Sequence, residues 1–523
     1  MIYNSIEALG LTPLQKPTVI VGGGTLGIYA AVELAKRGRE VVVIESGGEH
    51  LDNFNPETFE SVGRPHGTIK AGRSRSLGGT SNLWGGQLVE FQPIDFHGRD
   101  WLSDSRWPLD YADVSAHYAQ TYENLGIPTR FLTDRAVFQQ VNTPVPRFDQ
   151  GLELFLTRWM RLPSMAAAFR NELQNNRRLK TLLNHTVVGF RGTDGQISTV
   201  EVVDAEGRTH RIGGENFILA AGTIETVRLL LHAAHSQDWD CPWRDNQNVG
   251  LYFQDHLGGR VGEIIPIDRK KFLNLFSTIV LGGNKFLPKL RLTNDCLGRN
   301  RLLNIHAIVF CESSISENMV FLKQFLKAAI YSRRVSGVGE LIRHMTACGR
   351  HLPPLMWRYL VENRVLVPTG SKISLQLQSE QMPLAASRIT VDPSKRDIFG
   401  LPKVILDWRI GDEEFLSIRE FTLRCQKALA NSGLAEVRIL KDLADGNPTF
   451  LENLRDHNHH VGGARMGWSA KDGVVDRELR VFGTKNLHVL GASTFRTSSN
   501  ANTTFLALAL ATRFAKNLDS TRA

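Results

Sequence analysis

Length, composition and charge place the chain among ordinary folded proteins. Its 523 residues are enough for about two to four domains, and 42% hydrophobic with 22% charged residues excludes a disordered, collagenous or fibrous protein. The formal net charge of +9 comes from 62 basic against 53 acidic residues. This excess is mild for the length and is gathered at only one place, residues 321–364, which argues against a nucleic-acid partner.

Cysteine usage and the chain ends predict a cytoplasmic protein. The five cysteines contain no C-x-x-C pair, which is typical of reduced thiols rather than of a zinc ribbon or a disulfide scaffold. Residues 1–16 carry Glu7 and Lys16 and no apolar core, so we expect no secretory signal. The longest apolar run near the end, residues 505–511, is far shorter than the ~20 residues of a spanning helix.

The first elements of the chain read as strand, turn, helix and strand. Residues 17–21 are rich in β-branched side chains, as in a buried parallel strand, and they lead into the glycine-rich turn 22–27. An amphipathic stretch over 28–37 predicts a helix that ends at Gly38, and residues 41–44 predict the next strand.

This context makes G-x-G-x-x-G a dinucleotide-binding fingerprint. Gly22 permits the tight turn, Gly24 lets the backbone approach a pyrophosphate, and Gly27 lets the helix pack on the strand. Glu45 follows Gly22 by 23 residues and is placed to accept a hydrogen bond from a ribose hydroxyl. No Arg or Lys follows in residues 46–48 for a 2′-phosphate, which argues against NADP. This motif does not distinguish FAD from NAD. The alternative interpretation is a structural glycine turn that binds no ligand.

Two further segments fit contact with a buried ligand. Residues 73–86 are rich in Gly, Ser and Thr but include Leu83 and Trp84, which suits a loop lying on a flat aromatic ligand, or else a packed structural loop. Residues 215–222 predict a strand ending in small residues. Thr223 is then expected to cap the next helix, with Glu225 in its first turn.

The C-terminal part has the densest polar pattern. His457, His459 and His460 stand beside a glycine-rich turn, and residues 486–493 predict a strand with a small-residue turn before an Ala/Leu helix ending near residue 514. The three histidines could form a metal site, but no set with ligand spacing is complete, so we predict no metal. They could also be unrelated surface residues, or one catalytic histidine with neighbours that shape it.

Taken in order, these motifs resemble the glucose–methanol–choline (GMC) family of flavoprotein oxidoreductases. The resemblance is closest to bacterial members acting on sugars, through GGTSNLWGG and SRWPLDYADVSAHY. It extends from near the start of the chain to its end. The matching stretches are residues 18–45, 78–86, 105–126, 218–231, 248–256, 380–408 and 459–515.

The resemblance implies an α/β (α+β overall) fold with a Rossmann-like FAD-binding domain built from discontinuous segments. We expect this domain over 1–100, 180–260 and 445–523, and a substrate domain with a large antiparallel sheet and helices over 101–179 and 261–444. Five runs with alternating polarity are assigned to that sheet: residues 262–268, 304–310, 373–381, 388–392 and 404–409.

The resemblance also implies two active-site positions. His459 stands seven residues before Met466, as the family's histidine base does, and Asn502 takes the family's second position, although Thr503 replaces the usual Pro. Residues 81–83 contain no His that could link FAD covalently, so non-covalent FAD is expected. The residues predicted to bind it are Gly22, Gly24, Thr25, Leu26, Gly27, Glu45, Ser46, Arg73, Gly78, Gly79, Thr80, Asn82, Leu83, Trp84, Val188, Ala221, Gly222, Glu225, Gly491, Ala492 and Thr503.

The function implied is oxidation of an alcohol to a carbonyl. A sugar, glycoside or sugar-derived hydroxyl is the expected substrate, with O2 or another carrier as the electron acceptor. A hydrophobic alcohol such as a sterol is an alternative, and a flavin-binding protein without turnover is another. Asp255 and His256 are read as a structural pair, because adjacent residues on a strand point to opposite faces.

One segment remains outside this scheme, a basic helical insert at about residues 314–366. Residues 321–330 are amphipathic, with Lys and Arg outnumbering Glu between 321 and 364. We expect core-facing helices with a solvated basic side. The alternative roles of the insert are a lid over the active site, a dimer contact or a contact with an anionic membrane.

Overall fold

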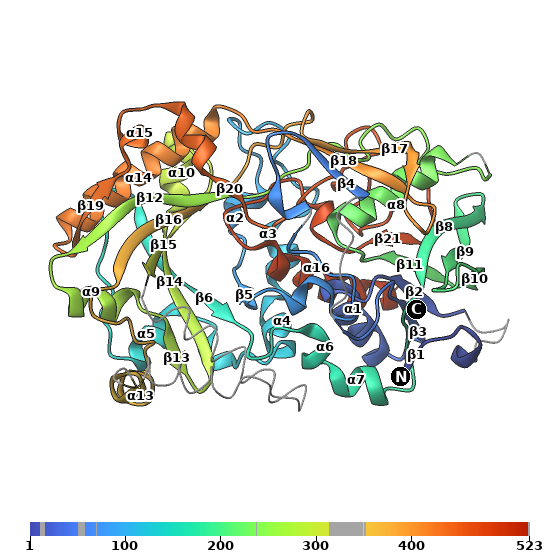
Figure 1. Ribbon diagram of the computed structural model, residues 1–523, viewed down its shortest axis with the longest axis horizontal. Helices are drawn as coiled ribbons and strands as arrows, with labels where there is room; N and C mark the ends of the chain where they lie inside the picture. Colours follow the sequence, from blue (N-terminus) through green and yellow to red (C-terminus); the bar gives the residue numbers. More distant parts are fainter. Residues whose placement is uncertain are drawn as a thin grey trace.

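Two β-sheets of different kinds organise the molecule. The computed structural model describes residues 1–10, 16–50, 58–69, 71–236, 238–312, 349 and 352–520. Figure 1 shows a parallel sheet on the right, a large antiparallel sheet on the left, and the long C-terminal helix α16 (Thr503–Ser520) between them. One hydrophobic core runs through both parts.

The parallel sheet is made from strands far apart in the sequence. Its order is β1-β7-β3-β2-β11-β21, and every pairing in it is parallel. The strands are short and rich in buried apolar residues, as expected where both faces are covered. They are β1 (Ile2–Tyr3), β2 (Thr18–Val21), β3 (Val41–Ile44), β7 (Leu179–Leu182), β11 (Asn216–Leu219) and β21 (Leu487–Val489).

Three helices belong to this part. α1 (Thr25–Lys36) follows β2, α8 (Thr223–His235) follows β11, and α16 packs against α1. The strand–turn–helix–strand prediction is therefore confirmed, but α1 begins three residues earlier than expected, and α16 continues to Ser520 rather than ending near residue 514. Among the additional residues, Gly27 of α1 and Ala515 of α16 are buried.

The antiparallel sheet has nine strands. Its path is β19-β12-β16-β15-β14-β6-β5, with β13 paired to β14 and β20 paired to β12. The long helix α14 (Glu413–Asn431) packs against β19, β15 and β6. The strands are β5 (Gln87–Leu88), β6 (Leu152–Trp159), β12 (Leu257–Pro266), β13 (Ile279–Leu281), β14 (Asn284–Leu292), β15 (Ile305–Glu312), β16 (Lys372–Ser379), β19 (Ala435–Ile439) and β20 (Arg455–Asp456).

Two of the five runs assigned to this sheet belong elsewhere. Residues 388–392 and 404–409 lie in β17 (Arg388–Arg396) and β18 (Pro402–Trp408), which form a separate sheet with β4 (Phe59–Gly63). β18 pairs in parallel with β4, and β17 packs against α8. Alternating polarity predicts a strand, but it carries no information about which sheet a hairpin joins.

The remaining elements are short and connect these layers. A third small sheet contains β8 (Thr186–Thr193), β9 (Gln196–Val203) and β10 (Thr209–Gly213). The other α-helices are α2 (Pro93–Phe96), α3 (Tyr111–Ser115), α4 (Tyr118–Asn124), α5 (Asp134–Gln140), α6 (Met165–Ala168), α7 (Arg170–Asn175), α9 (Arg269–Phe276), α10 (Asn294–Asn300), α13 (Leu352–Leu360) and α15 (Lys441–Ala444). Single 3₁₀ turns are η1 (Glu7–Leu9), η3 (Gly67–Ile69), η4 (Gly79–Asn82), η5 (Thr129–Phe131), η6 (Pro448–Asn453) and η7 (Ala492–Thr494).

The predicted domain boundaries remain a prediction. Segments expected in the cofactor domain contribute the short strands β5 and β20 to the large antiparallel sheet.

Much of the basic insert, including the amphipathic stretch 321–330, lies outside the described residues. The helix α13 belongs to the C-terminal end of the insert, and its side chains Met356, Trp357 and Leu360 are exposed. Across the described ranges, the helices fall short of the length and apolar character that crossing a membrane requires.

Candidate active site

A cavity of about 270 Å³ lies where the strands of the parallel sheet end. Its lining includes the residues that directly follow β2, β3, β11 and β21, which is where ligands bind in open parallel sheets. Among the residues predicted to bind the cofactor, those in this lining are Gly22, Gly24, Thr25, Leu26, Glu45, Ser46, Arg73, Gly79, Thr80, Ala221, Gly222, Glu225, Gly491, Ala492 and Thr503.

The glycine turn leaves space in front of its backbone. A Cβ at Gly27 would stand 1.8 Å from the carbonyl oxygen of Gly22, so this glycine allows α1 to pack on the turn. A Cβ at Gly24 would meet only the Cα of Gly79, at 4.0 Å. The backbone at Gly24 therefore faces the open cavity, and the N-terminus of α1 points into it, as a pyrophosphate requires.

Glu45 is a buried carboxylate that supports this turn. Its two oxygens accept hydrogen bonds from the backbone N–H groups of Gly23, at 2.7 Å, and Gly47, at 2.9 Å. Burial raises its pKa to about 7 even though these hydrogen bonds favour the ionised form. Glu45 also lines the cavity, so the predicted contact with a ribose hydroxyl remains open to it.

Six predicted residues do not line this cavity. Gly27 packs against the turn, and the Gly78 N–H donates to the carbonyl of Gly23, at 2.8 Å. The remaining four are Asn82, Leu83, Trp84 and Val188. Their roles as cofactor contacts stay predictions.

The loop 82–84 is occupied by contacts within the protein. The Asn82 amide donates to the Leu77 carbonyl at 2.9 Å, and the Trp84 indole N–H donates to the Pro163 carbonyl at 2.8 Å. Leu83 is 48% exposed. On β8 Thr186 and Val187 line the cavity and Val188 does not, next to an irregularity in the strand pairing between Val187 and Gly189.

The predicted cap of α8 is wrong. Gly222 is the residue that precedes the helix, and Thr223 is its first residue. The Thr223 hydroxyl donates to the carbonyl of His460, at 2.7 Å, and thus links α8 to the histidine segment. A glycine is needed before the helix because its φ is +78° there.

Two ion pairs hold Glu225 at the edge of the cavity. It contacts Arg73 at 3.0 Å and Arg228 at 3.3 Å. Burial opposes ionisation, but the Arg228 and Arg73 guanidinium groups outweigh it and keep the pKa of Glu225 below its usual value.

Sequence reasoning missed part of the lining. His460 is not among the predicted cofactor contacts. Ser74 and Arg75 lie in the loop 73–86, which is expected to contact the ligand, whereas His185, Thr186 and Val187 carry no local signal, because they reach the cavity only through the fold. Lining residues not predicted include Ser74, Arg75, His185, Thr186, Val187, Asn458, His460 and Thr504.

His459 and Asn502 lie together, although 43 residues separate them. His459 is in the loop after β20, and Asn502 directly precedes α16. The Asn502 amide nitrogen stands 2.7 Å from His459 Nε2. Burial lowers the pKa of His459 well below 6.5, and the neighbouring His256 ring acts in the same direction. The imidazole is therefore neutral at physiological pH.

Asp255 and His256 both contact this histidine. An Asp255 carboxylate oxygen accepts from the His459 backbone N–H at 2.9 Å, and the two Nδ1 atoms of His256 and His459 are 2.8 Å apart. The interpretation of the two residues as a structural pair rests on the assumption of strand alternation. That assumption does not apply here, because both residues lie in an irregular stretch before β12 and both contact His459.

The three C-terminal histidines do not form one metal-ligand set. Within the described residues, a group with suitable spacing consists of His66, Asp255 and His460, whose ligand atoms lie within 4.8 Å of one another. Hydrogen bonds already occupy these atoms, since His66 Nε2 is 3.1 Å from Asp255 and His460 Nε2 is 3.2 Å from the Thr68 hydroxyl.

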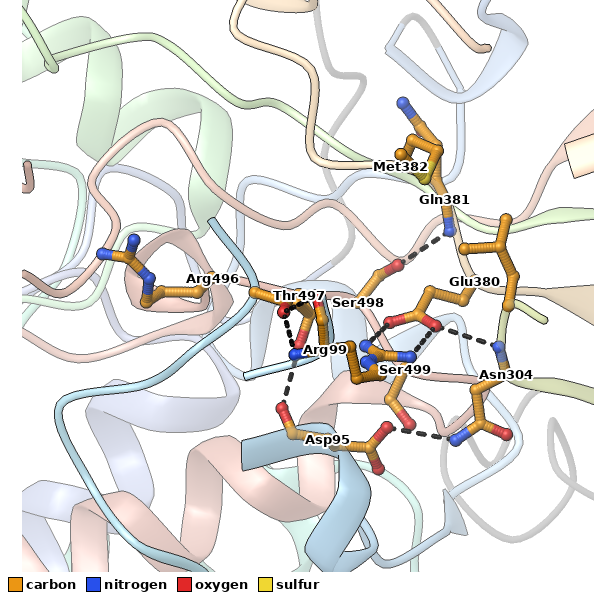
Figure 2. A network of polar contacts seen from close by, with 12 residues as sticks. Asp95, Arg99, Asn304, Glu380, Gln381, Met382, Arg496, Thr497, Ser498 and Ser499 are labelled. Atoms are coloured by element: carbon orange, nitrogen blue, oxygen red, sulfur yellow. Dashed lines mark hydrogen bonds and ion pairs between the residues drawn. The ribbon is translucent and has the colours of Figure 1, made fainter. Parts of the chain in front are cut away.

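A buried polar network fixes the segment that leads to Asn502. Figure 2 shows Arg99 paired with both oxygens of Glu380, at 2.7 and 2.6 Å, beside the chain from Arg496 to Ser499. The Gln381 N–H donates to the Ser498 hydroxyl at 3.1 Å. Bidentate, charge-assisted contacts of this kind hold a loop in one geometry.

Comparisons with protein families agree with this arrangement. Residues 383–511 match the model described as GMC oxidoreductase, and residues 18–262 match the model described as FAD dependent oxidoreductase.

Three curated relatives are distant. The fructose dehydrogenase large subunit of Gluconobacter japonicus is 22% identical over 64% of this chain, which spans about half (53%) of that protein. The 2-methyl-1,2-propanediol dehydrogenase of Mycolicibacterium austroafricanum is 20% identical over 95% of this chain and 94% of its own. For the 6'''-hydroxyparomomycin C oxidase of Streptomyces lividus the identity is 20%, over 96% of this chain and 91% of that protein.

Solved structures share the fold. Pyridoxine 4-oxidase from Mesorbium loti aligns with a TM-score of 0.59 and 19% identity, over 97% of this chain and 99% of that one. Formate oxidase aligns with a TM-score of 0.58 and 17% identity, with the same coverage. The two family matches show that the chain belongs to the GMC oxidoreductases and is an FAD-dependent alcohol oxidoreductase.

Proposed function

We propose that the protein oxidises a hydroxyl of a sugar, glycoside or sugar-derived alcohol to a carbonyl, with His459 as the base and FAD held non-covalently. The observation that carries this proposal is the contact between His459 Nε2 and the Asn502 amide, at 2.7 Å. An alcohol carbon can lose hydride only if its hydroxyl proton is also removed, and a neutral imidazole is suited to that task.

The residues around the cavity fit the cofactor. The open backbone at Gly24 and the start of α1 would hold the pyrophosphate, and Glu45 would accept from the ribose. When bound, FAD supplies the acceptor for the hydride that the alcohol carbon loses. Residues 81–83 offer no His for a covalent link, which supports non-covalent binding.

His459 and Asn502 would divide the work on the substrate hydroxyl. His459 Nε2 takes the proton as the O–H bond breaks, and the Asn502 amide N–H donates to the oxygen on which negative charge develops. The Asn502 side-chain oxygen is buried and has no hydrogen-bond partner within the described structure, so it is available to a ligand.

The surroundings of His459 favour a hydroxylated substrate over a sterol. Gln378 on β16 lies opposite His306 on β15, and the Lys289 amine on β14 is 2.9 Å from His306 Nε2. Burial lowers the pKa of Lys289 to about 7, so the amine is partly uncharged at neutral pH. Asn500 Nδ2 and His306 Nδ1 are buried without partners in the described structure. Such groups suit a polar ligand, whereas an apolar alcohol would leave them unpaired.

An anaerobic panel tests this proposal. Holoenzyme is mixed with sugars, glycosides, aminosugars, cyclitols and sterols, and the flavin absorbance is followed. Bleaching by one of the hydroxylated classes is expected. Bleaching only by sterols would overturn the substrate class, and no bleaching by any alcohol would favour a flavin-binding protein without turnover. Mixing the reduced enzyme with O2 or with a quinone then identifies the acceptor.

A further inference from the structure

We infer that His256 is a positioning residue that sets the tautomer of His459 and leaves its Nε2 free to take the substrate proton. This inference rests on the proposed function, because it concerns the same base. It is carried by the hydrogen-bond partners of each ring nitrogen, which together allow one arrangement of protons.

His256 carries its proton on Nε2. Its Nε2 faces two carbonyl oxygens, those of Ser499 at 2.8 Å and Ser498 at 3.1 Å. A carbonyl oxygen can only accept, so Nε2 must carry a hydrogen.

The other nitrogen of the same ring, Nδ1, accepts a hydrogen bond. The Gln378 amide nitrogen lies 2.9 Å from His256 Nδ1 and 3.0 Å from the Asn500 carbonyl. The carbonyl contact identifies this amide atom as the NH₂ group, so it donates to His256 Nδ1, which must accept. Burial also keeps the pKa of His256 below its usual value, which favours the neutral ring.

The accepting Nδ1 of His256 determines where His459 carries its proton. Its Nδ1 is 2.8 Å from the accepting Nδ1 of His256, so His459 Nδ1 carries the hydrogen of that contact. A neutral imidazole has one N–H, and His459 Nε2 is therefore the basic nitrogen. The Asn502 amide N–H points at this same atom, at 2.7 Å, which agrees with an accepting Nε2.

The arrangement also stabilises the protonated base. When the substrate O–H bond breaks and an N–H bond forms at Nε2, His459 becomes an imidazolium whose Nδ1–H still donates to His256. Charged and titratable groups that act on His459 are Asp255, which favours the imidazolium, and His256, His457 and Lys289, which oppose it when charged. Because the His256 ring is neutral in this arrangement, it acts on His459 through the accepting Nδ1 and not through a positive charge. Loss of this acceptor should lower the pKa of His459 further.

The carbonyls that hold His256 are themselves fixed. The Ser498 N–H donates to Gln254 at 3.1 Å, and the Ser498 hydroxyl accepts from the Gln381 N–H, as Figure 2 shows. The segment cannot follow a change in the His256 proton without breaking these contacts.

Nitrogen-15 NMR of holoenzyme labelled at histidine tests the inference directly. The signals of His459 are assigned by their absence in His459→Ala. In the wild type we expect a hydrogen on Nδ1 of His459 and none on its Nε2. In His256→Phe, which removes the acceptor and keeps ring volume, we expect a mixture of tautomers. In His256→Asn, the amide oxygen replaces the accepting nitrogen and should restore the Nδ1–H form.

Flavin reduction by the panel alcohol that bleaches the flavin fastest gives a second measurement. His256→Phe should lower the limiting rate constant by roughly 10–10²-fold with unchanged substrate affinity, and should move the acid limb of the pH profile to lower pH. His256→Asn should recover most of both effects. As a matched control, His488→Phe removes a buried histidine of β21 and should leave the limb in place.

The outcomes separate the two proposals. A hydrogen on Nε2 of wild-type His459, or a His256→Phe enzyme with an unchanged tautomer and pH profile, overturns the role of His256. If His256→Phe does not retain FAD, the wild-type spectrum and His256→Asn still decide. The expected tautomer combined with undiminished flavin reduction in His459→Ala would instead overturn the proposed base.

Discussion

Removal of the base is the most informative perturbation of the site. His459→Ala deletes the nitrogen that is 2.7 Å from the Asn502 amide, and in the structure no other imidazole is described in contact with that amide. A lost general base slows the proton-coupled step by ~10²–10⁴-fold, which corresponds to roughly 3–5 kcal/mol at 1.36 kcal/mol per tenfold. FAD should be retained, because His459 does not belong to the lining of the cofactor cavity.

Asn502→Ala should slow the same step less. It removes one donor to a developing negative charge, and a hydrogen bond to a charged group contributes roughly 1.5–3 kcal/mol, or about 10–10²-fold. His460→Ala and His457→Ala should have smaller effects on the rate constant. His460 is among the residues that line the cavity, so its replacement should instead weaken FAD retention.

The assay is anaerobic stopped flow on the reductive half-reaction, so that the electron acceptor does not enter. Each variant is first compared with the wild type in flavin content and melting temperature. The order His459, then Asn502, then His460 and His457 is the expected result. A nearly silent His459→Ala with a strongly damaged His460→Ala would refute the reasoning and move the base to His460.

The remaining predictions concern the cofactor and the stability of the fold. Gly24→Val should fold but fail to retain FAD, which is measured by flavin absorbance. Gly27→Ala should lower the melting temperature measured by calorimetry, because the new Cβ would stand 1.8 Å from the Gly22 carbonyl oxygen. Acid precipitation of the yellow protein should release FAD into the supernatant, and colour in the pellet would contradict non-covalent binding. Arg99→Met should cost about 3–5 kcal/mol in urea unfolding by leaving Glu380 buried without its partner, and a loss below about 1 kcal/mol would contradict this. Burial raises the pKa of Glu414 from 4.5 to about 7. The protonated Glu414 side chain therefore contributes fully to folding stability below pH 4.5, and this contribution is lost as the pH rises to about 7. Glu414→Gln should flatten the pH dependence of the melting temperature between these two pH values.

Local patterns in the sequence determined the elements of the cofactor site. The β-branched run before Gly22, the glycine turn and the helix after it interact over a few residues, so the chain can be read there without knowledge of the fold. Several predicted cofactor residues line the cavity for the same reason, since Gly22, Glu45, Ala221 and Gly491 closely follow strands that local sequence already indicates. The positions of His459 and Asn502 came from the family resemblance.

Only the tertiary structure decided how distant residues meet. His256 and His459 are 203 residues apart, and Gln378 and His256 are 122 apart, so no spacing in the sequence links them. The sheet joined by β17 and β18, and the choice of Val187 over Val188, likewise depend on partners contributed by remote segments. Such contacts form only when the chain is packed, because burial and hydrogen bonding are satisfied by the nearest group in space, whatever its place in the sequence.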